Sequence, residues 1–96
     1  MRRDEVIRLI REHDSEIRAF GVRHLSLFGS VARDTAGPSS DVDVLVDFEA
    51  VPSFEQYMGL RAFLEDLLGS SIDLADRAAL RARIRPRIEE EAIAVA

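Results

Sequence analysis

Hydrophobic and polar residues alternate along the chain in patterns that predict both helices and strands. Between residues 3 and 20 the apolar side chains fall near one face of a helix, and Gly21 is suited to end it. The short apolar run at 25–28 predicts a strand. From Asp41 to Phe48, valines occupy every second position, which makes this segment the clearest strand in the chain.

The middle of the chain predicts one longer helix. Ser53 and Gln56 have the spacing of a capping box, which marks a helix start, and Gly69 is suited to end the helix. An apolar stripe at helical spacing runs between them, and we expect its aromatic and methionine side chains to lie mostly in the core. These side chains are Phe54, Tyr57, Met58 and Phe63.

The remaining segments complete an alternating order of helices and strands. Residues 72–74 predict a third strand, Asp76 is suited to cap a helix through Leu80, and Pro86 fits the first turn of a last helix. Apolar side chains of these last helices would either pack on the sheet or form a partner surface (Ile84, Ile88, Ile93, Val95). The order predicts an α/β fold, a small mixed β-sheet packed with helices, in a single domain over residues 1–96.

Composition narrows the possible functions. The 96 residues are 47% hydrophobic and 32% charged, which is typical of a globular domain and excludes disorder. The chain has no cysteine, no apolar run as long as a membrane span and no signal segment, so we expect a soluble cytoplasmic protein. The net charge of −5 makes strong direct binding of nucleic acid unexpected. Every basic residue is arginine, which excludes Schiff-base lysine chemistry and a P-loop lysine.

The first candidate for chemistry is Gly29-Ser30, which lies between the strand at 25–28 and a possible helical turn at 31–33. Glycine lets the backbone approach a ligand closely, and free N–H groups at a helix start favour phosphate. The Ser30 hydroxyl would bond a phosphate oxygen. Alternatively, the pair is an ordinary turn in which Ser30 caps the helix.

The second candidate is a set of three carboxylates in strands. Asp41 and Asp43 are two residues apart, so their side chains share one face of the sheet and repel each other unless a cation lies nearby. If Asp73 shares that face, the three would form a two-metal site for phosphoryl transfer. Alternatively, the carboxylates face solvent on an exposed surface. Asp47 also shares this face, but we expect it to be a solvated strand end.

Together these residues carry a family resemblance. Gly29-Ser30, ten intervening residues, Asp41-x-Asp43 and a later strand aspartate resemble the nucleotidyltransferase superfamily of DNA polymerase β. The segments LFGSVAR (27–33) and SDVDVLV (40–46) are more closely similar to the minimal nucleotidyltransferase family, and the resemblance covers essentially the whole chain. One position departs from the family pattern, because Asp34 stands where many members have glycine.

The resemblance implies a fold, a reaction and a set of site residues. The fold would be that of the polymerase β palm, and the reaction would be attack on the α-phosphate of ATP with release of pyrophosphate. Gly29 and Ser30 would bind the triphosphate. Asp41, Asp43 and Asp73 would hold two Mg²⁺ ions, with Asp73 on the ion that activates the acceptor hydroxyl. Arg33 would neutralise phosphate charge, or alternatively form a salt bridge with Asp34 or Asp41.

The resemblance also implies a protein partner. The chain is short, so we expect the acceptor to be brought by another molecule. In this family the usual partner is a HEPN ribonuclease toxin encoded nearby, and the antitoxin transfers AMP to a toxin hydroxyl, typically that of a tyrosine, as in a type VII toxin–antitoxin pair. Two alternatives remain open. The protein could neutralise its partner by binding alone, or it could modify a small molecule or an RNA end.

Overall fold

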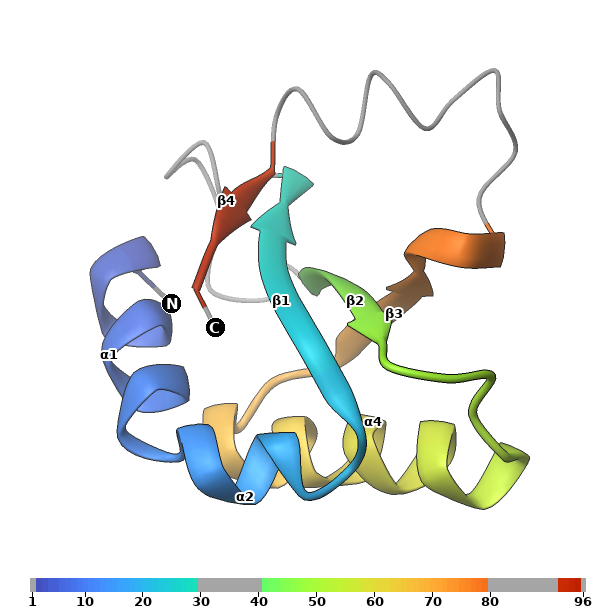
Figure 1. Cartoon of the computed structure of the whole chain (residues 1–96). Coiled ribbons are helices and arrows are strands. Elements are labelled where there is room, and N and C mark those ends of the chain that lie inside the picture. Colours follow the sequence, from blue (N-terminus) through green and yellow to red (C-terminus); the bar gives the residue numbers. More distant parts are fainter. Residues whose placement is uncertain (1, 30–40, 80–91, 96) are drawn as a thin grey trace.

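The computed structural model of the chain describes residues 2–29, 41–79 and 92–95. These residues form a four-stranded sheet in the order β3-β2-β1-β4, with the helices packed against one of its faces (Figure 1). The sheet is mixed, because β1 runs antiparallel to both β2 and β4 whereas β2 and β3 run parallel. The α/β fold with a small mixed sheet, predicted from the sequence, is confirmed.

The first helical region is divided into two helices. Helix α1 spans Arg3–Glu12 and α2 spans Asp14–Arg18, so the prediction of one helix through residue 20 is wrong. The break lies at His13, whose backbone leaves the helical range (φ −113°, ψ 26°) and whose N–H bonds Ile10 O at 3.1 Å. This shorter bond ends the regular ladder of α1. The chain turns there, and α2 leads into the first strand (Figure 1).

Four strands build the sheet: β1 (Val22–Phe28), β2 (Val42–Phe48), β3 (Ile72–Asp76) and β4 (Ile93–Ala94). The predicted strands are all present, although β1 begins three residues before residue 25. Gly21 has a φ of +82° and precedes β1, in agreement with its predicted role of ending the helical region. Parallel β2 and β3 are connected through helix α4 (Phe54–Leu68).

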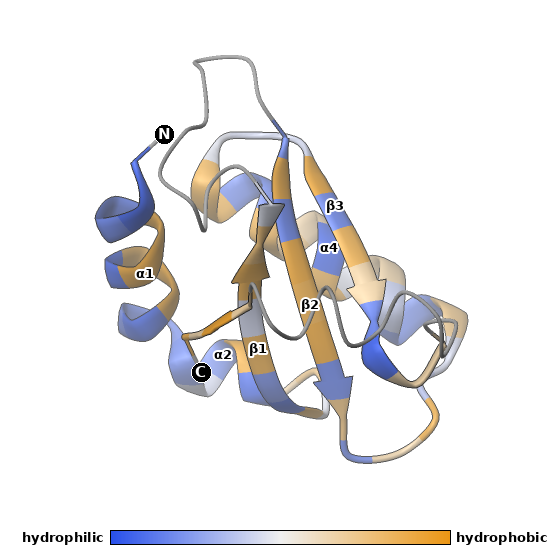
Figure 2. Cartoon of the chain, turned by 90° about the horizontal axis from the view of Figure 1, so that it is seen from above, coloured by the Kyte–Doolittle hydropathy of each residue, from blue (hydrophilic) through white to orange (hydrophobic). Residues whose placement is uncertain are grey.

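The two faces of the sheet carry different side chains. On the helix side, alternate residues of β1, β2 and β3 join the buried side chains of the helices in one core. The other face, which Figure 2 views with α4 behind the sheet, carries the intervening positions of each strand. In β2 these positions are Asp43, Leu45 and Asp47, of which Leu45 is buried and the two aspartates are half-buried. The core therefore fixes which strand residues lie on the second face.

Helix α4 begins and ends as the sequence predicts. Gln56 N–H donates to the Ser53 hydroxyl at 3.0 Å, and the Gln56 side chain accepts from Ser53 N–H, which completes the capping box. Gly69 ends the helix in the left-handed conformation with a φ of +64°. Leu60, Leu64 and Leu68 are buried against the sheet.

One expected core residue of α4 lies outside the core. Phe54 occupies the first position of the helix, and 79% of its surface is exposed. The prediction of a core role for Phe54 is therefore wrong. Tyr57 and Phe63, further along the helix, pack partly buried against the core, as predicted.

The end of the chain differs most from its prediction. Asp76 Oδ1 accepts from Ala78 N–H at 3.0 Å and so caps the 3₁₀ helix η1 (Arg77–Ala79), as predicted. Ile93 does not continue a last helix but begins β4, and Val95 is buried, with its N–H donating to Leu25 O at 2.9 Å. The otherwise unpaired edge of β1 offers these hydrogen bonds, which a helix at 93–95 would leave unmade. Residues 80–91, with Ile84, Pro86 and Ile88, lie outside the described residues.

Candidate active site

The glycine of the predicted Gly29-Ser30 pair follows β1 directly and has a φ of +69°. A Cβ built on Gly29 would lie 2.1 Å from Asp43 Oδ2 and 2.9 Å from Asp43 Cγ. No side chain fits into that space, so the backbone at residue 29 can meet the carboxylate of Asp43 only because it is glycine. The strand register explains the approach, because Phe28 is the partner of Asp43 in the β1–β2 ladder.

Asp43 and Asp73 are direct partners in the parallel β2–β3 ladder. Neighbouring strands are about 4.8 Å apart, and side chains of paired residues point to the same face of a sheet. Asp73 is exposed and Asp43 is half-buried, on the face opposite the core. Asp41 lies one residue before β2, is also exposed, and belongs by alternation to the same face.

Three segments that are distant in sequence thus meet at one end of the sheet. They are the end of β1 at Gly29, the beginning of β2 at Asp43 and the beginning of β3 at Asp73. Ser30 and Arg33, the other two residues predicted for this site, lie outside the described residues, as does the predicted helical turn at 31–33. The predicted placement of Asp73 on the same side as Asp43 agrees with the ladder.

The donor set fits a hard divalent cation such as Mg²⁺. All three candidate ligands are carboxylates, which provide the oxygen donors that this ion binds. Within the described ranges, however, no three His, Cys, Asp or Glu side chains gather closely enough to hold a metal ion. The residue types and their shared face therefore suit the ion, while the carboxylates are not drawn together around a common point.

A tyrosine supports β3 at the position beside Asp73. The Tyr57 hydroxyl, from α4, donates to the carbonyl oxygen of Leu74. Ser71 O accepts from Val42 N–H in the β2–β3 ladder, so by alternation the Leu74 carbonyl faces away from β2, on the outer edge of the sheet. Tyr57 thus satisfies an edge carbonyl that the ladder leaves open. The sequence placed Tyr57 in the core and gave no sign of this contact.

The surroundings of Tyr57 favour its neutral form. Desolvation by burial raises the pKa of the Tyr57 hydroxyl, Arg61 opposes this effect, and the negative charges of Asp73 and Asp76 add to it.

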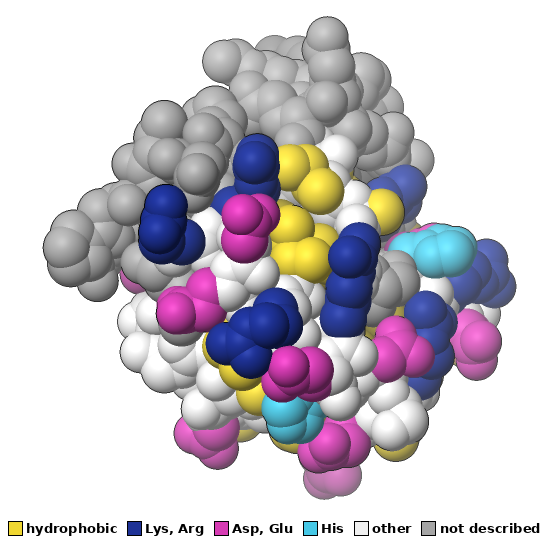
Figure 3. Space-filling model, turned by 90° about the vertical axis from the view of Figure 1, so that its left-hand side faces the viewer, with side chains coloured by type: hydrophobic (Ala, Val, Ile, Leu, Met, Phe, Trp, Pro, Cys, Tyr) yellow, Lys and Arg dark blue, Asp and Glu magenta, His cyan; other side chains and the backbone are white. Residues whose placement is uncertain are grey.

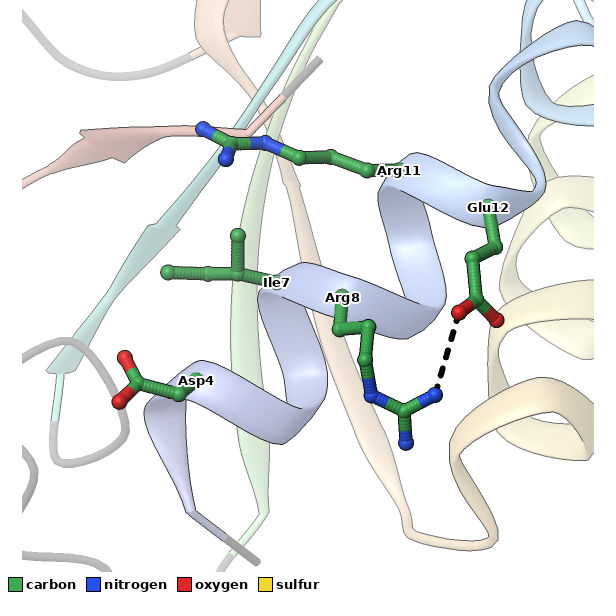
Figure 4. Close-up of a pocket in the computed structure, with 5 residues that line it drawn as sticks. All are labelled: Asp4, Ile7, Arg8, Arg11 and Glu12. Atoms are coloured by element: carbon green, nitrogen blue, oxygen red, sulfur yellow. Dashed lines mark hydrogen bonds and ion pairs between the residues drawn. The ribbon is translucent and has the colours of Figure 1, made fainter.

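A separate cavity lies against α1 and contains none of the predicted site residues. It is a shallow, open pocket of about 570 Å³, lined by Asp4, Ile7, Arg8, Arg11 and Glu12. Figure 4 shows Arg8 paired with Glu12, at 3.1 Å, while Asp4, Ile7 and Arg11 point to another side of the helix. On this side of the molecule arginines are interspersed with acidic side chains around a small apolar area (Figure 3), so the visible face carries no patch of one sign.

The comparison with known families identifies the chain. Residues 6–95 match the nucleotidyltransferase domain family, and the chain therefore belongs to this family and is a nucleotidyltransferase. Within the family it is a homologue of the protein adenylyltransferase MntA of Thermococcus cleftensis. The two are 39% identical over 93 residues, which cover 96% of this chain and 94% of the relative.

Solved structures agree with this assignment. A candidate minimal nucleotidyltransferase superposes with a TM-score of 0.82 at 36% identity, covering 97% of this chain and 95% of the other. A second match comes from the complex of a tri-AMPylated HEPN toxin of Shewanella oneidensis with its MNT antitoxin. Its TM-score is 0.68 at 17% identity, with 94% of this chain and 71% of the other covered, and it supports the fold alone. Among the described residues no helix is both long and apolar enough to span a membrane.

Proposed function

We propose that this nucleotidyltransferase transfers AMP from ATP to a tyrosine hydroxyl of a HEPN-type toxin and thereby acts as its antitoxin. The name of the Thermococcus relative, a protein adenylyltransferase, supports the reaction. The AMPylated HEPN toxin in complex with an MNT antitoxin supports the class of partner. The proposal places the protein where its partner is made, in the cytoplasm.

The proposed reaction is an in-line displacement at the α-phosphorus of ATP. The acceptor oxygen forms a bond to this phosphorus as the bond to the β-phosphate oxygen breaks, so AMP becomes attached to the hydroxyl and pyrophosphate leaves. Asp73 accepts the proton of the hydroxyl. Gly29 and Ser30 bind the triphosphate, and Arg33 neutralises its charge. Asp41, Asp43 and Asp73 would hold two Mg²⁺ ions, which stabilise charge on the attacking and leaving oxygens.

The observation that carries the proposal is the meeting of Gly29, Asp43 and Asp73 at one end of the sheet. Asp43 and Asp73 are opposite each other in strand register, and carboxylates on one face of a sheet provide the oxygen donors that a divalent cation binds. At the same end, the backbone of Gly29 approaches the Asp43 carboxylate so closely that a side chain at residue 29 would displace it. A site for a cation and a polyphosphate accounts for both features.

The proposal is tested by label transfer. The purified protein is mixed with Mg²⁺, ATP labelled in its α-phosphate and the product of the neighbouring gene, which is tested as the HEPN-type partner. We expect label on a tyrosine of the partner with the wild type and a loss of at least about a hundredfold with Asp73→Asn. Asp47→Asn is a matched control, because Asp47 lies on the same strand and face as Asp43 but four residues further along β2.

Each result separates the proposal from its alternatives. Label on RNA or on a small molecule, with none on the partner, would overturn the protein acceptor. Tight binding and neutralisation of the partner without any transfer would make the protein a binding antitoxin. Equal transfer by the wild type and Asp73→Asn would remove Asp73 from the site.

A further inference from the structure

An apolar groove lies at the opposite end of β2 and β3 from the candidate active site. It has a volume of about 370 Å³ and lies between the β2–α4 connection and η1. Seven residues line it. Asp76 is charged, and the other six are apolar: Phe48, Ala50, Val51, Pro52, Ala78 and Ala79. In Figure 1 these two segments lie on the side of the molecule away from α1.

Two large apolar side chains are exposed in the segment that forms one wall of the groove and continues into α4. Val51 lines the groove and is 96% exposed, and Phe54, three residues further along the chain, is 79% exposed. They are the only large hydrophobic side chains that are exposed among residues 2–29, 41–79 and 92–95. Single exposed apolar residues are ordinary, but two of them close together in sequence, one of which lines an apolar groove, are typical of a protein interface, where aromatic anchors carry much of the binding energy.

The charges around the groove indicate what it binds. Asp76 lines the groove itself. Glu49, between the lining residues Phe48 and Ala50, and Glu55, directly after Phe54, are both exposed. Among the described residues, the arginine nearest to the groove in sequence is Arg77, which is half-buried. A second copy of the chain would bring like charges together across the contact, which is unfavourable. A partner with Lys or Arg side chains around an apolar anchor would complement this surface.

We infer that the groove with Val51 and Phe54 is a docking surface for the protein partner, which inserts apolar side chains flanked by basic residues. This inference relies on the proposed function for the identity of the partner. Phe48 and Asp43 are five residues apart along β2, or about 17 Å, so an anchor here does not touch the reacting groups. Docking would hold the partner while its acceptor hydroxyl enters and leaves the site.

Binding and catalysis can be measured separately. With the adjacent-gene protein as partner, we expect Val51→Ser/Phe54→Ser to raise Kd and KM for the partner at least about tenfold. The kcat at saturating partner should stay within about twofold, because contacts remote from the reaction contribute equally to ground and transition states. An unchanged melting temperature and unchanged thermal shift with Mg²⁺-ATP show that the double variant is folded and binds nucleotide.

The charge requirement has a matched control. Glu55→Arg should weaken partner binding, and the loss should shrink as salt rises. Glu16→Arg makes the same change in net charge on exposed α2, away from the groove, and should have little effect. Equal effects of the two reversals would overturn the basic partner.

Other outcomes overturn the docking surface itself. One is an unchanged Kd for the double serine variant. Another is a wild-type homodimer in solution that this variant dissociates, because a second copy would then occupy the groove. If no variant transfers AMP but the double variant still binds the partner less tightly, the docking surface stands and the proposed reaction fails.

Discussion

At the scale of single residues, Gly29 decides how closely the end of β1 approaches the Asp43 carboxylate. The position combines a left-handed backbone with the absence of space for a Cβ. Gly69 has almost the same φ, +64° against +69°, but no atom lies within 4 Å of the place its Cβ would take. A substitution at Gly69 would therefore strain the backbone only, whereas a substitution at Gly29 would also displace the Asp43 carboxylate.

This pair gives a clean comparison. Gly29→Ala and Gly69→Ala should each lower the free energy of unfolding by roughly 1 kcal/mol, because alanine is strained at positive φ. Only Gly29→Ala should also reduce AMP transfer, by between about tenfold and a hundredfold, because it pushes Asp43 from its place. Chemical denaturation and the label-transfer assay measure the two effects, and equal activity of both variants would show that Gly29 serves the turn alone.

Asp73 offers a second prediction at this scale. Asp73→Asn removes one of two like charges in direct register, and such a pair is unfavourable by about 0.2–1 kcal/mol. In the absence of metal, the melting temperature of the variant should therefore be a few degrees above that of the wild type. Mg²⁺ should raise the melting temperature of the wild type more than that of Asp73→Asn. Differential scanning fluorimetry with and without chelator measures both. A metal-free variant less stable than the wild type would mean that the carboxylate makes a structural hydrogen bond instead.

At the scale of elements, α4 supports the active end of β3 through Tyr57. A raised pKa means that the folded protein keeps the phenolic proton to higher pH than the unfolded chain does. The stability that Tyr57 contributes is therefore complete below pH about 10 and is lost as the pH rises through the raised pKa. Alkali should loosen the contact between α4 and the edge strand.

Tyr57→Phe tests this coupling. It removes the hydrogen bond to Leu74 O, so the free energy of unfolding at neutral pH should fall by about 1 kcal/mol. The decline of stability above pH about 10 should become shallower than in the wild type. Urea unfolding across alkaline pH measures both, and Tyr57 is the only tyrosine in the chain, so its ionisation can be followed by absorbance. The same alkaline slope in both proteins would refute the coupling.

Elements with strong local signals could be predicted, and elements that depend on distant partners could not. The valines of β2 and the capping box of α4 specify their structures locally. The two residues of β4 have no pattern of their own and become a strand only because β1 has an open edge. His13 breaks the first helical region without a glycine or proline to mark it.

At the scale of the whole molecule, the shared face of the carboxylates could be predicted from alternation, whereas their neighbours could not. The spacing of Asp41 and Asp43 set their common side, but the pairing of Asp43 with Asp73 depends on a register between strands about 30 residues apart. The contact of Gly29 with Asp43 also arises only in three dimensions. The groove at Val51 was not foreseen, because its two walls come from separate segments.

The register between β2 and β3 has a consequence for how this protein can change. The pairs on either side of Asp43 and Asp73 in the ladder, Val42 with Ile72 and Val44 with Leu74, fill the core. Sliding β3 by one residue would turn Asp73 inward and its apolar neighbours outward together. A mutant in which catalysis is lost through misalignment of these strands should therefore also lose its fold. We therefore expect stable descendants that have lost the Asp43–Asp73 pair to arise by replacement of the acidic side chains and not by a shift of the strand that carries Asp73.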